Sequence, residues 1–157
     1  MLGNLQPQQI EDVLKSQQIG RIGCSLDGYT YVVPISYAYD GNYIYCHTTE
    51  GKKTSMMRQN PKICFEVEEM KDMSNWKSVV IQGEFEELKD IQQRNNAMRS
   101  LLNRYLPVIS SITTHIGESW PFHPENISEI NGVVFRIKIK EKTGRFEINT
   151  QSPNMAG

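Results

Sequence analysis

The chain has 157 residues, of which 38% are hydrophobic and 22% are charged, and its formal net charge at pH 7 is −1. This length and composition predict a single globular domain over residues 1–157, and the dispersed lysines and arginines argue against nucleic acid as a partner. Because no apolar run reaches transmembrane length and the N-terminus lacks a signal-peptide pattern, we expect a cytoplasmic protein that does not contact a membrane.

The N-terminal part of the sequence predicts a helix followed by a hairpin. Apolar residues recur at helical spacing within residues 8–16, which indicates a short helix. Residues 19–26 have the pattern of a strand, and the Asp27-Gly28 pair that follows is a strong signal for a hairpin turn. We expect the next strand to run without interruption from Tyr29 to Tyr39.

The predicted strand Tyr29–Tyr39 has two contrasting faces. One face carries large apolar or aromatic side chains, as expected against a core: Tyr29, Tyr31, Val33, Ile35, Tyr37 and Tyr39. The other face carries small or compact residues and no charges: Thr30, Val32, Pro34, Ser36 and Ala38. Pro34 lacks a backbone N–H and therefore favours an edge strand. Two interpretations stay open, namely a face on which a flat ring can approach the backbone, or an edge strand packed under a loop.

Short elements continue through the middle of the chain. A tight turn at residues 40–42 leads into an aromatic-rich strand over residues 43–47. A short helix is predicted over residues 54–59, and Asn60-Pro61 ends it. Residues 62–68 then alternate again, which predicts another strand.

Two adjacent lysines, Lys52 and Lys53, stand just before the predicted helix, with Ser55 behind them. Lysines, hydroxyls and the unpaired N–H groups of a helix N-terminus together form a seat for one phosphate group. The alternative is a solvated lysine pair on a turn. The sequence alone does not decide between the two.

The C-terminal half predicts strands around one longer helix. We expect a strand over residues 77–88, a strand over residues 132–141, a turn at Thr143-Gly144 and a last short strand over residues 145–148. Residues 89–106 are predicted to be helical, with a buried stripe formed by Met98, Leu101, Leu102 and Tyr105. Six or seven strands joined by tight turns predict an antiparallel barrel, which hides its own edges.

The segment between residues 107 and 131 is long for a loop, and loops of this length are usually functional or disordered. It contains Trp120 and Phe122, together with His115 and His123. The two histidines lack the spacing of metal ligands, so we predict no metal site.

Several catalytic patterns are missing from the sequence. No Gly-x-Gly-x-x-Gly follows a strand, which argues against a Rossmann nucleotide site. The chain has no Gly-x-Ser-x-Gly, Cys-x-x-Cys or His-Glu-x-x-His, so hydrolase and zinc functions lack support. The odd number and wide spacing of the cysteines predict reduced, buried thiols at Cys24, Cys46 and Cys64.

His47 ends the strand that precedes the lysine pair, and Thr48 follows it. Two roles stay open for this histidine. Its imidazole can satisfy backbone groups as a structural element, or it can line a ligand pocket and donate a proton there.

Several segments follow one another in an order that is specific to one family. They are residues 19–23, 31–37, 45–48, 51–53, 58–65, 78–83, 135–137 and 143–145. In this order they resemble the pyridoxamine 5′-phosphate oxidase-like FMN-binding split barrels, and most of all the branch that contains the nitroimidazole-resistance proteins. The resemblance extends from Ile19 to about Glu147.

The resemblance implies a mainly β fold, an antiparallel split β-barrel of six or seven strands with a few flanking helices. It also implies a homodimer with FMN at the subunit interface. Lys52, Lys53 and Ser55 would hold the FMN phosphate, and His47 and Thr48 would lie near the ribityl chain or the ring. The residues along the isoalloxazine would be Val33, Pro34, Ile35 and Ser36. Trp120 or Phe122 would reach the flavin of the partner subunit.

Two departures from the family matter. The pyridoxamine phosphate oxidases proper carry an Arg-Lys pair where this chain has Lys52-Lys53, and they use a C-terminal Trp and Arg constellation that residues 145–157 lack. The resemblance therefore predicts an FMN-dependent oxidoreductase in which NAD(P)H reduces the flavin, a small flat acceptor such as a nitroaromatic takes the electrons, and His47 is the catalytic residue. The alternatives are a protein on the same fold that holds haem, a deazaflavin or FMN without turnover, and a structural barrel without a cofactor.

Overall fold

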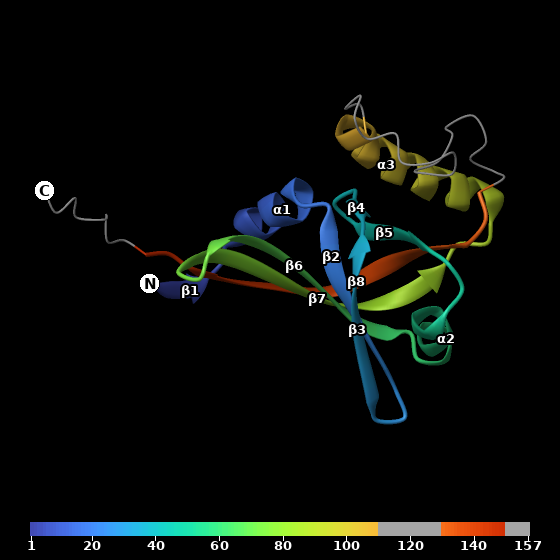
Figure 1. Cartoon of the computed structure of the whole chain (residues 1–157), viewed down its shortest axis with the longest axis horizontal. Coiled ribbons are helices and arrows are strands. Elements are labelled where there is room, and N and C mark those ends of the chain that lie inside the picture. Colours follow the sequence, from blue (N-terminus) through green and yellow to red (C-terminus); the bar gives the residue numbers. More distant parts are fainter. Residues whose placement is uncertain (110–129, 150–157) are drawn as a thin grey trace, which may run out of the picture.

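The computed structural model describes residues 1–109 and 130–149, with side chains for residues 1–104 and 130–149. Within these ranges the chain forms three helices and one antiparallel sheet of eight strands (Figure 1). The predicted mainly β, antiparallel split barrel with a few flanking helices is confirmed. The strand that sequence analysis did not predict is β1 (Leu2–Asn4), which pairs with the end of β8. No helix in the described ranges is long and apolar enough to cross a membrane.

The strand order explains why the barrel is split. The order is β3 (Tyr29–Ser36), β2 (Ile19–Leu26), β6 (Lys62–Asp72), β7 (Asn75–Glu87), β8 (Val133–Glu147), β5 (Tyr43–Thr48) and β4 (Ala38–Tyr39). The two ends of this order, β3 and β4, are consecutive in the chain. In the described part of the chain no hydrogen-bonded ladder joins these ends, so the sheet curls on itself and stays open between them.

The expected uninterrupted strand Tyr29–Tyr39 is wrong, because the chain changes its pairing partner at Tyr37. This residue is fully buried, and its N–H donates to the carbonyl of Gln18 (3.0 Å) while its hydroxyl donates to the carbonyl of Leu14 (2.7 Å). Its ring packs edge-on against Phe65 with centroids 5.3 Å apart. These contacts turn the backbone from one end of the sheet to the other while the alternation of side chains continues. The prediction of an edge strand for β3 is confirmed.

The expected turn at Thr143-Gly144 and the separate strand after it are also wrong, since β8 runs straight through both residues. Gly144 is not among the residues with positive φ. A Cβ at this position would lie 2.8 Å from Leu5 Cδ1 and 3.0 Å from Ile10 Cγ1. The glycine therefore gives the N-terminal segment room to pack closely on the sheet, and it does not make a turn.

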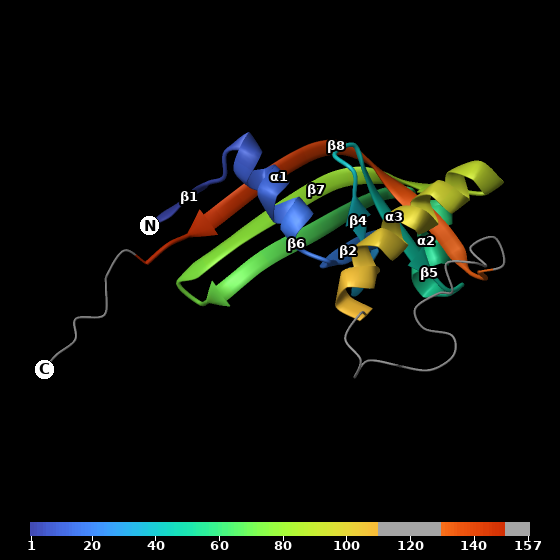
Figure 2. The same ribbon diagram turned by 90° about the horizontal axis from the view of Figure 1, so that it is seen from above.

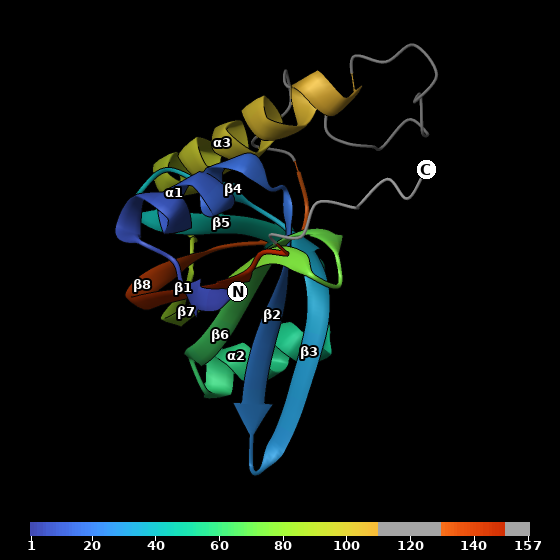
Figure 3. The same cartoon turned by 90° about the vertical axis from the view of Figure 1, so that its left-hand side faces the viewer.

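The helices lie on two sides of the sheet. Figures 1 and 3 show α1 (Pro7–Ser16) and α3 (Ile91–Ile109) on one side and α2 (Lys52–Gln59) on the other, beside the β2–β3 hairpin. Figure 2 shows the β6–β7–β8 ribbon extending away from α3 towards the N-terminus. Of the predicted stripe on α3, the residues with described side chains are all buried: Met98, Leu101 and Leu102. The predicted stripe residue Tyr105 lies outside the described side chains.

Candidate functional site

The lysine pair lies in the first turn of α2, two residues earlier than the predicted start of this helix. Gly51 precedes the helix, and its N–H donates to Oγ1 of the buried Thr54 (2.9 Å). The first backbone bond of the helix runs from the N–H of Ser55 to the carbonyl of Gly51 (3.1 Å). The N–H groups of Lys52, Lys53 and Thr54 come before that bond and have no carbonyl partner within the helix, so together with the two ammonium groups they can receive an anion. We call these groups the phosphate seat.

Lys52 connects the phosphate seat to the edge strand β3. Its ammonium donates to the hydroxyl of Tyr29 (3.0 Å) and lies 4.3 Å from the centroid of that ring and 5.0 Å from the centroid of Tyr31. The hydrogen bond to Tyr29 raises the pKa of Lys52, so this side chain stays charged. Sequence analysis had assigned both tyrosines to the core face only, and Tyr29 is in fact 56% exposed.

Lys53 is less exposed than Lys52 and has other neighbours. Its side chain is half-buried, and its charge acts on the thiols of Cys24 and Cys46, two residues whose side chains face the core. Burial raises the pKa of both thiols, and the charge of Lys53 opposes this effect only in part. Both thiols are therefore protonated at neutral pH, in agreement with the prediction of buried, reduced cysteines; Cys64 is free but only half-buried.

The four β3 residues expected along a flavin ring do not share a face. Ile35 is buried in the core and Val33 packs against it, whereas strand alternation turns Pro34 and Ser36 to the opposite side. What these residues share is the backbone edge of β3. Within the described residues β3 pairs only with β2, so its other edge offers N–H and C=O groups to a ligand.

The small-residue face of β3 continues onto the neighbouring strands and lines an open cavity of about 730 Å³. Thr30 and Val32 contribute from β3, Gly23 from β2, and Cys64 and Gln82 from β6 and β7. Val32 is 60% exposed here. Three charged residues, Arg21, Lys62 and Glu66, also line the cavity, and it is open on the described part of the chain.

His47 lies near the end of β5, on the opposite face from Cys46, and is paired with Val134 of β8. Its Nε2 is 2.8 Å from the carbonyl of Asn131. Gly132 makes space for the ring, because a Cβ there would lie 2.8 Å from Nε2. Its pKa is lowered, chiefly by burial and further by the charge of Arg94, while the Asn131 carbonyl opposes the shift. The imidazole lies opposite Val134, a member of the buried cluster under α3, and the catalytic role of His47 stays a prediction.

Replacing His47 with asparagine is expected to remove a pH dependence of folding. Because the pKa of His47 is lowered in the folded state, the unfolded chain binds the proton first as the pH falls through about 6.5, and stability declines below that pH until the folded pKa is passed. The variant should lose about 1 kcal/mol at pH 7.5 and lack this part of the decline. Urea unfolding at pH 5.5 and 7.5 measures it. An unchanged decline in the variant would assign the pH dependence to other groups.

Thr48 and Ser55 have modest roles in the described structure. Thr48 is half-buried at the end of β5, opposite Val133 in β8. Ser55 is exposed, and its hydroxyl and its carbonyl accept hydrogen bonds from the side-chain amide of Gln59 (3.4 and 3.3 Å). The predicted interface residues Trp120 and Phe122 lie outside the described residues.

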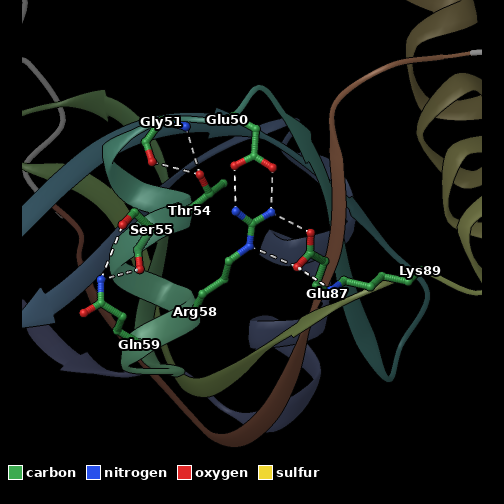
Figure 4. Close-up of polar contacts among 8 residues, drawn as sticks. All are labelled: Glu50, Gly51, Thr54, Ser55, Arg58, Gln59, Glu87 and Lys89. Atoms are coloured by element: carbon green, nitrogen blue, oxygen red, sulfur yellow. Dashed lines mark hydrogen bonds and ion pairs between the residues drawn. The ribbon is translucent and has the colours of Figure 1, made fainter.

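An ion-pair network holds the loop before α2. The guanidinium of Arg58 makes two hydrogen bonds to Glu50 (2.6 and 2.7 Å) and two to Glu87 (3.1 and 2.7 Å), as Figure 4 shows. Sequence analysis did not assign a role to any of these three residues. Their order along the chain gave no signal, because Arg58 and Glu87 are 29 residues apart and meet only in the folded sheet.

Comparison with known proteins decides the family. The family model described as pyridoxamine 5′-phosphate oxidase matches residues 6–146, which is most of the chain. The chain belongs to this family. The suspected resemblance is therefore confirmed at the level of the family.

Three proteins illustrate what the chain is similar to. A protein of unknown function from Rhizobium meliloti is 36% identical over 85 residues, which are 54% of this chain and 56% of that protein, so the match spans about half of the relative's length. A FAD-binding protein of Mesorhizobium loti is 29% identical with a TM-score of 0.73, covering 93% of this chain and 98% of that one. A candidate 5-nitroimidazole antibiotic resistance protein of Bacteroides thetaiotaomicron is 18% identical with a TM-score of 0.70, covering 93% and 87%, and shows the fold alone.

Proposed function

We propose that the chain binds FMN at the phosphate seat and the adjoining edge of β3, and uses it as an oxidoreductase. NAD(P)H would be the electron donor and a small flat molecule such as a nitroaromatic the acceptor. Family membership and the FAD-binding relative of Mesorhizobium loti support a flavin. The observation that carries the proposal is the position of Lys52, which is tied to the phosphate seat by α2 and to β3 by Tyr29.

The chemistry of the seat favours a single terminal phosphate. Two lysines and three N–H groups without a partner inside the helix suit a dianion, and the sequence lacks the glycine fingerprint that holds the pyrophosphate of a dinucleotide. The unpaired edge of β3 can supply hydrogen bonds to the polar edge of a flat ring. A bound flavin supplies the electron-transfer chemistry, and the chain supplies its binding and orientation.

A flavin titration tests the proposal. We expect apo-protein to bind FMN at least about tenfold more tightly than riboflavin, since one charge-assisted hydrogen bond contributes about 1.5–3 kcal/mol. Quenching of flavin fluorescence reports the affinity, and FAD serves as the third ligand. Equal affinity for FMN and riboflavin would mean that the phosphate seat does not bind the phosphate. Tighter binding of FAD than of FMN would identify FAD as the cofactor.

The redox part of the proposal needs a separate measurement. With FMN bound, anaerobic addition of NADH or NADPH should bleach the flavin absorbance, and a nitroaromatic acceptor should restore it. A flavin that neither donor reduces would favour the alternative of a cofactor-binding protein without turnover. Neither outcome changes the conclusion of the titration about FMN binding, because the flavin is bound before the donor is added.

We propose further that a second copy of the chain covers the small-residue face of β3 and its neighbours. The resemblance implies a homodimer, and the exposure of Ile19 and Val32, each 60%, leaves apolar surface on this part of the sheet. Light scattering at micromolar concentration should give twice the 18.1 kDa mass of the chain. A measured mass equal to that of one chain would contradict the proposed dimer.

A further inference from the structure

Glu50 is the acidic residue closest in sequence to the phosphate seat. It stands one residue before Gly51, and the first turn of α2 contains no acidic residue. A carboxylate at this place would ordinarily interact with the free N–H groups and the positive end of the helix dipole. It would then occupy the same donors that an incoming phosphate needs.

In the structure the carboxylate of Glu50 is bound by Arg58 and not by the N–H groups of the phosphate seat. Both of its oxygens accept hydrogen bonds from the guanidinium of Arg58, in a two-pronged pair at 2.6 and 2.7 Å (Figure 4). Arg58 is itself fixed from the other side by two bonds to Glu87, which lies at the end of β7 and is less exposed than Glu50. The carboxylate is therefore anchored through Arg58 to the sheet.

The ionisation of Glu50 makes this anchoring consequential. The hydrogen bonds from Arg58 lower the pKa of Glu50 and of Glu87, so both remain negatively charged at neutral pH. A released Glu50 would be a full charge next to the phosphate seat, since it stands one residue before Gly51, and the hydroxyl of Thr54 ties Gly51 to the first turn of α2 with two hydrogen bonds of 2.9 Å. Lys89 lies 4.0 Å from Glu87, and its charge acts on both carboxylates more weakly than the hydrogen bonds from Arg58 do.

We propose that Arg58 is a positioning residue that keeps the carboxylate of Glu50 off the phosphate seat, so that the seat stays open for an anionic cofactor. Glu50 is in this view a restrained competitor inside the chain, and Glu87 holds Arg58 in place. The inference rests on the proposed function, because it takes the phosphate of FMN as the anion.

A network that only fastened the loop to the sheet would behave differently. In that case the loss of Glu50 would weaken FMN binding as much as the loss of Arg58, because either change breaks the same link. A competitor gives the opposite result, since the loss of Glu50 removes the group that blocks the seat. If only the total charge near the seat mattered, replacing Glu50 would change the FMN affinity by the same factor whether or not Arg58 is present.

A double-mutant cycle separates these cases. Arg58→Ala should weaken FMN by about tenfold, Glu50→Gln alone should change the affinity by less than about twofold, and the double variant should recover to within about threefold of the unmodified chain. Riboflavin, which has no phosphate, should bind all four proteins alike. Lys140→Ala, which removes one positive charge from the ion pair with Glu84, is the control and should leave FMN affinity unchanged.

The outcomes distinguish this inference from the proposed function. If the unmodified chain binds FMN no better than riboflavin, the phosphate seat and the inference fall together. If FMN is preferred but Glu50→Gln gives no greater recovery in the Arg58→Ala background than alone, the inference alone is overturned. Should Arg58→Ala not fold, as judged by circular dichroism, Arg58→Lys keeps the charge without the four-bond geometry and should show a smaller loss that Glu50→Gln again reverses.

Discussion

The double replacement of Lys52 and Lys53 with alanine is expected to weaken FMN binding at least about a hundredfold, because two charge-assisted contacts to one phosphate are lost at about 1.5–3 kcal/mol each. Each single replacement should weaken binding roughly ten- to a hundredfold by the same reasoning. Lys52 is exposed and Lys53 half-buried, both in the first turn of α2, so the fold should survive. Fluorescence titration of the apo-protein measures the effect.

A charge-matched control makes this result specific. Lys71 and Lys77 lie on β6 and β7 near the far end of the long ribbon, and replacing both with alanine changes the net charge by the same amount. That variant should bind FMN with the affinity of the unmodified chain. The affinity for riboflavin should be the same in both double variants and in the unmodified chain. If the Lys52 and Lys53 variant keeps its FMN affinity, the phosphate is bound elsewhere and the proposed site is wrong.

Replacing Gly20 with alanine is expected to destabilise the fold by about 2–3 kcal/mol, which is the cost of overfilling a packed core. A Cβ at this position would lie 2.8 Å from Cε1 of the fully buried Phe65 and 2.9 Å from the backbone carbonyl of Glu66. The carbonyl belongs to the neighbouring strand β6 and cannot move without disturbing the sheet. Urea unfolding at one fixed protein concentration gives the difference.

The partner variant Phe65→Leu tests the cause of this destabilisation. Alone it should cost about 1–1.5 kcal/mol, and combined with Gly20→Ala it should cost less than the sum of the two by at least about 0.5 kcal/mol, because the smaller side chain relieves the contact. Strict additivity would mean that the glycine and the ring do not limit each other. An unchanged stability of Gly20→Ala would contradict the close packing of β2 on the core.

Local signals in the sequence were sufficient for most of the elements. The Asp27-Gly28 pair makes its turn with positive φ at both residues, 50° and 79°, which a hairpin of this kind requires. The alternation of residues 62–68 gives β6, and the start of α2 follows from Gly51 and the lysines within one turn. Such features depend on neighbours a few residues apart, and these neighbours are visible in a linear sequence.

The tertiary structure decided the features that depend on distant partners. The break at Tyr37 arises because this residue contacts Leu14 of α1, Gln18 of the α1–β2 connection and Phe65 of β6. The pair Thr143-Gly144 has the residue types of a turn. Leu5 and Ile10 of the N-terminal segment pack against Gly144, however, and β8 continues through it. In both places long-range packing outweighed a local preference of about 1 kcal/mol or less.

The candidate site divides in the same way. The sequence by itself determined that two lysines stand at the N-terminus of a helix, and the family pattern assigned a phosphate to them. Only the folded sheet places Tyr29 against Lys52, brings Glu87 to Arg58 and sets the Asn131 carbonyl against His47. The reason is physical: the side chains at i and i+2 share a face whatever the fold, but the residue that meets them across 23 or 29 positions is fixed only when the strands pair.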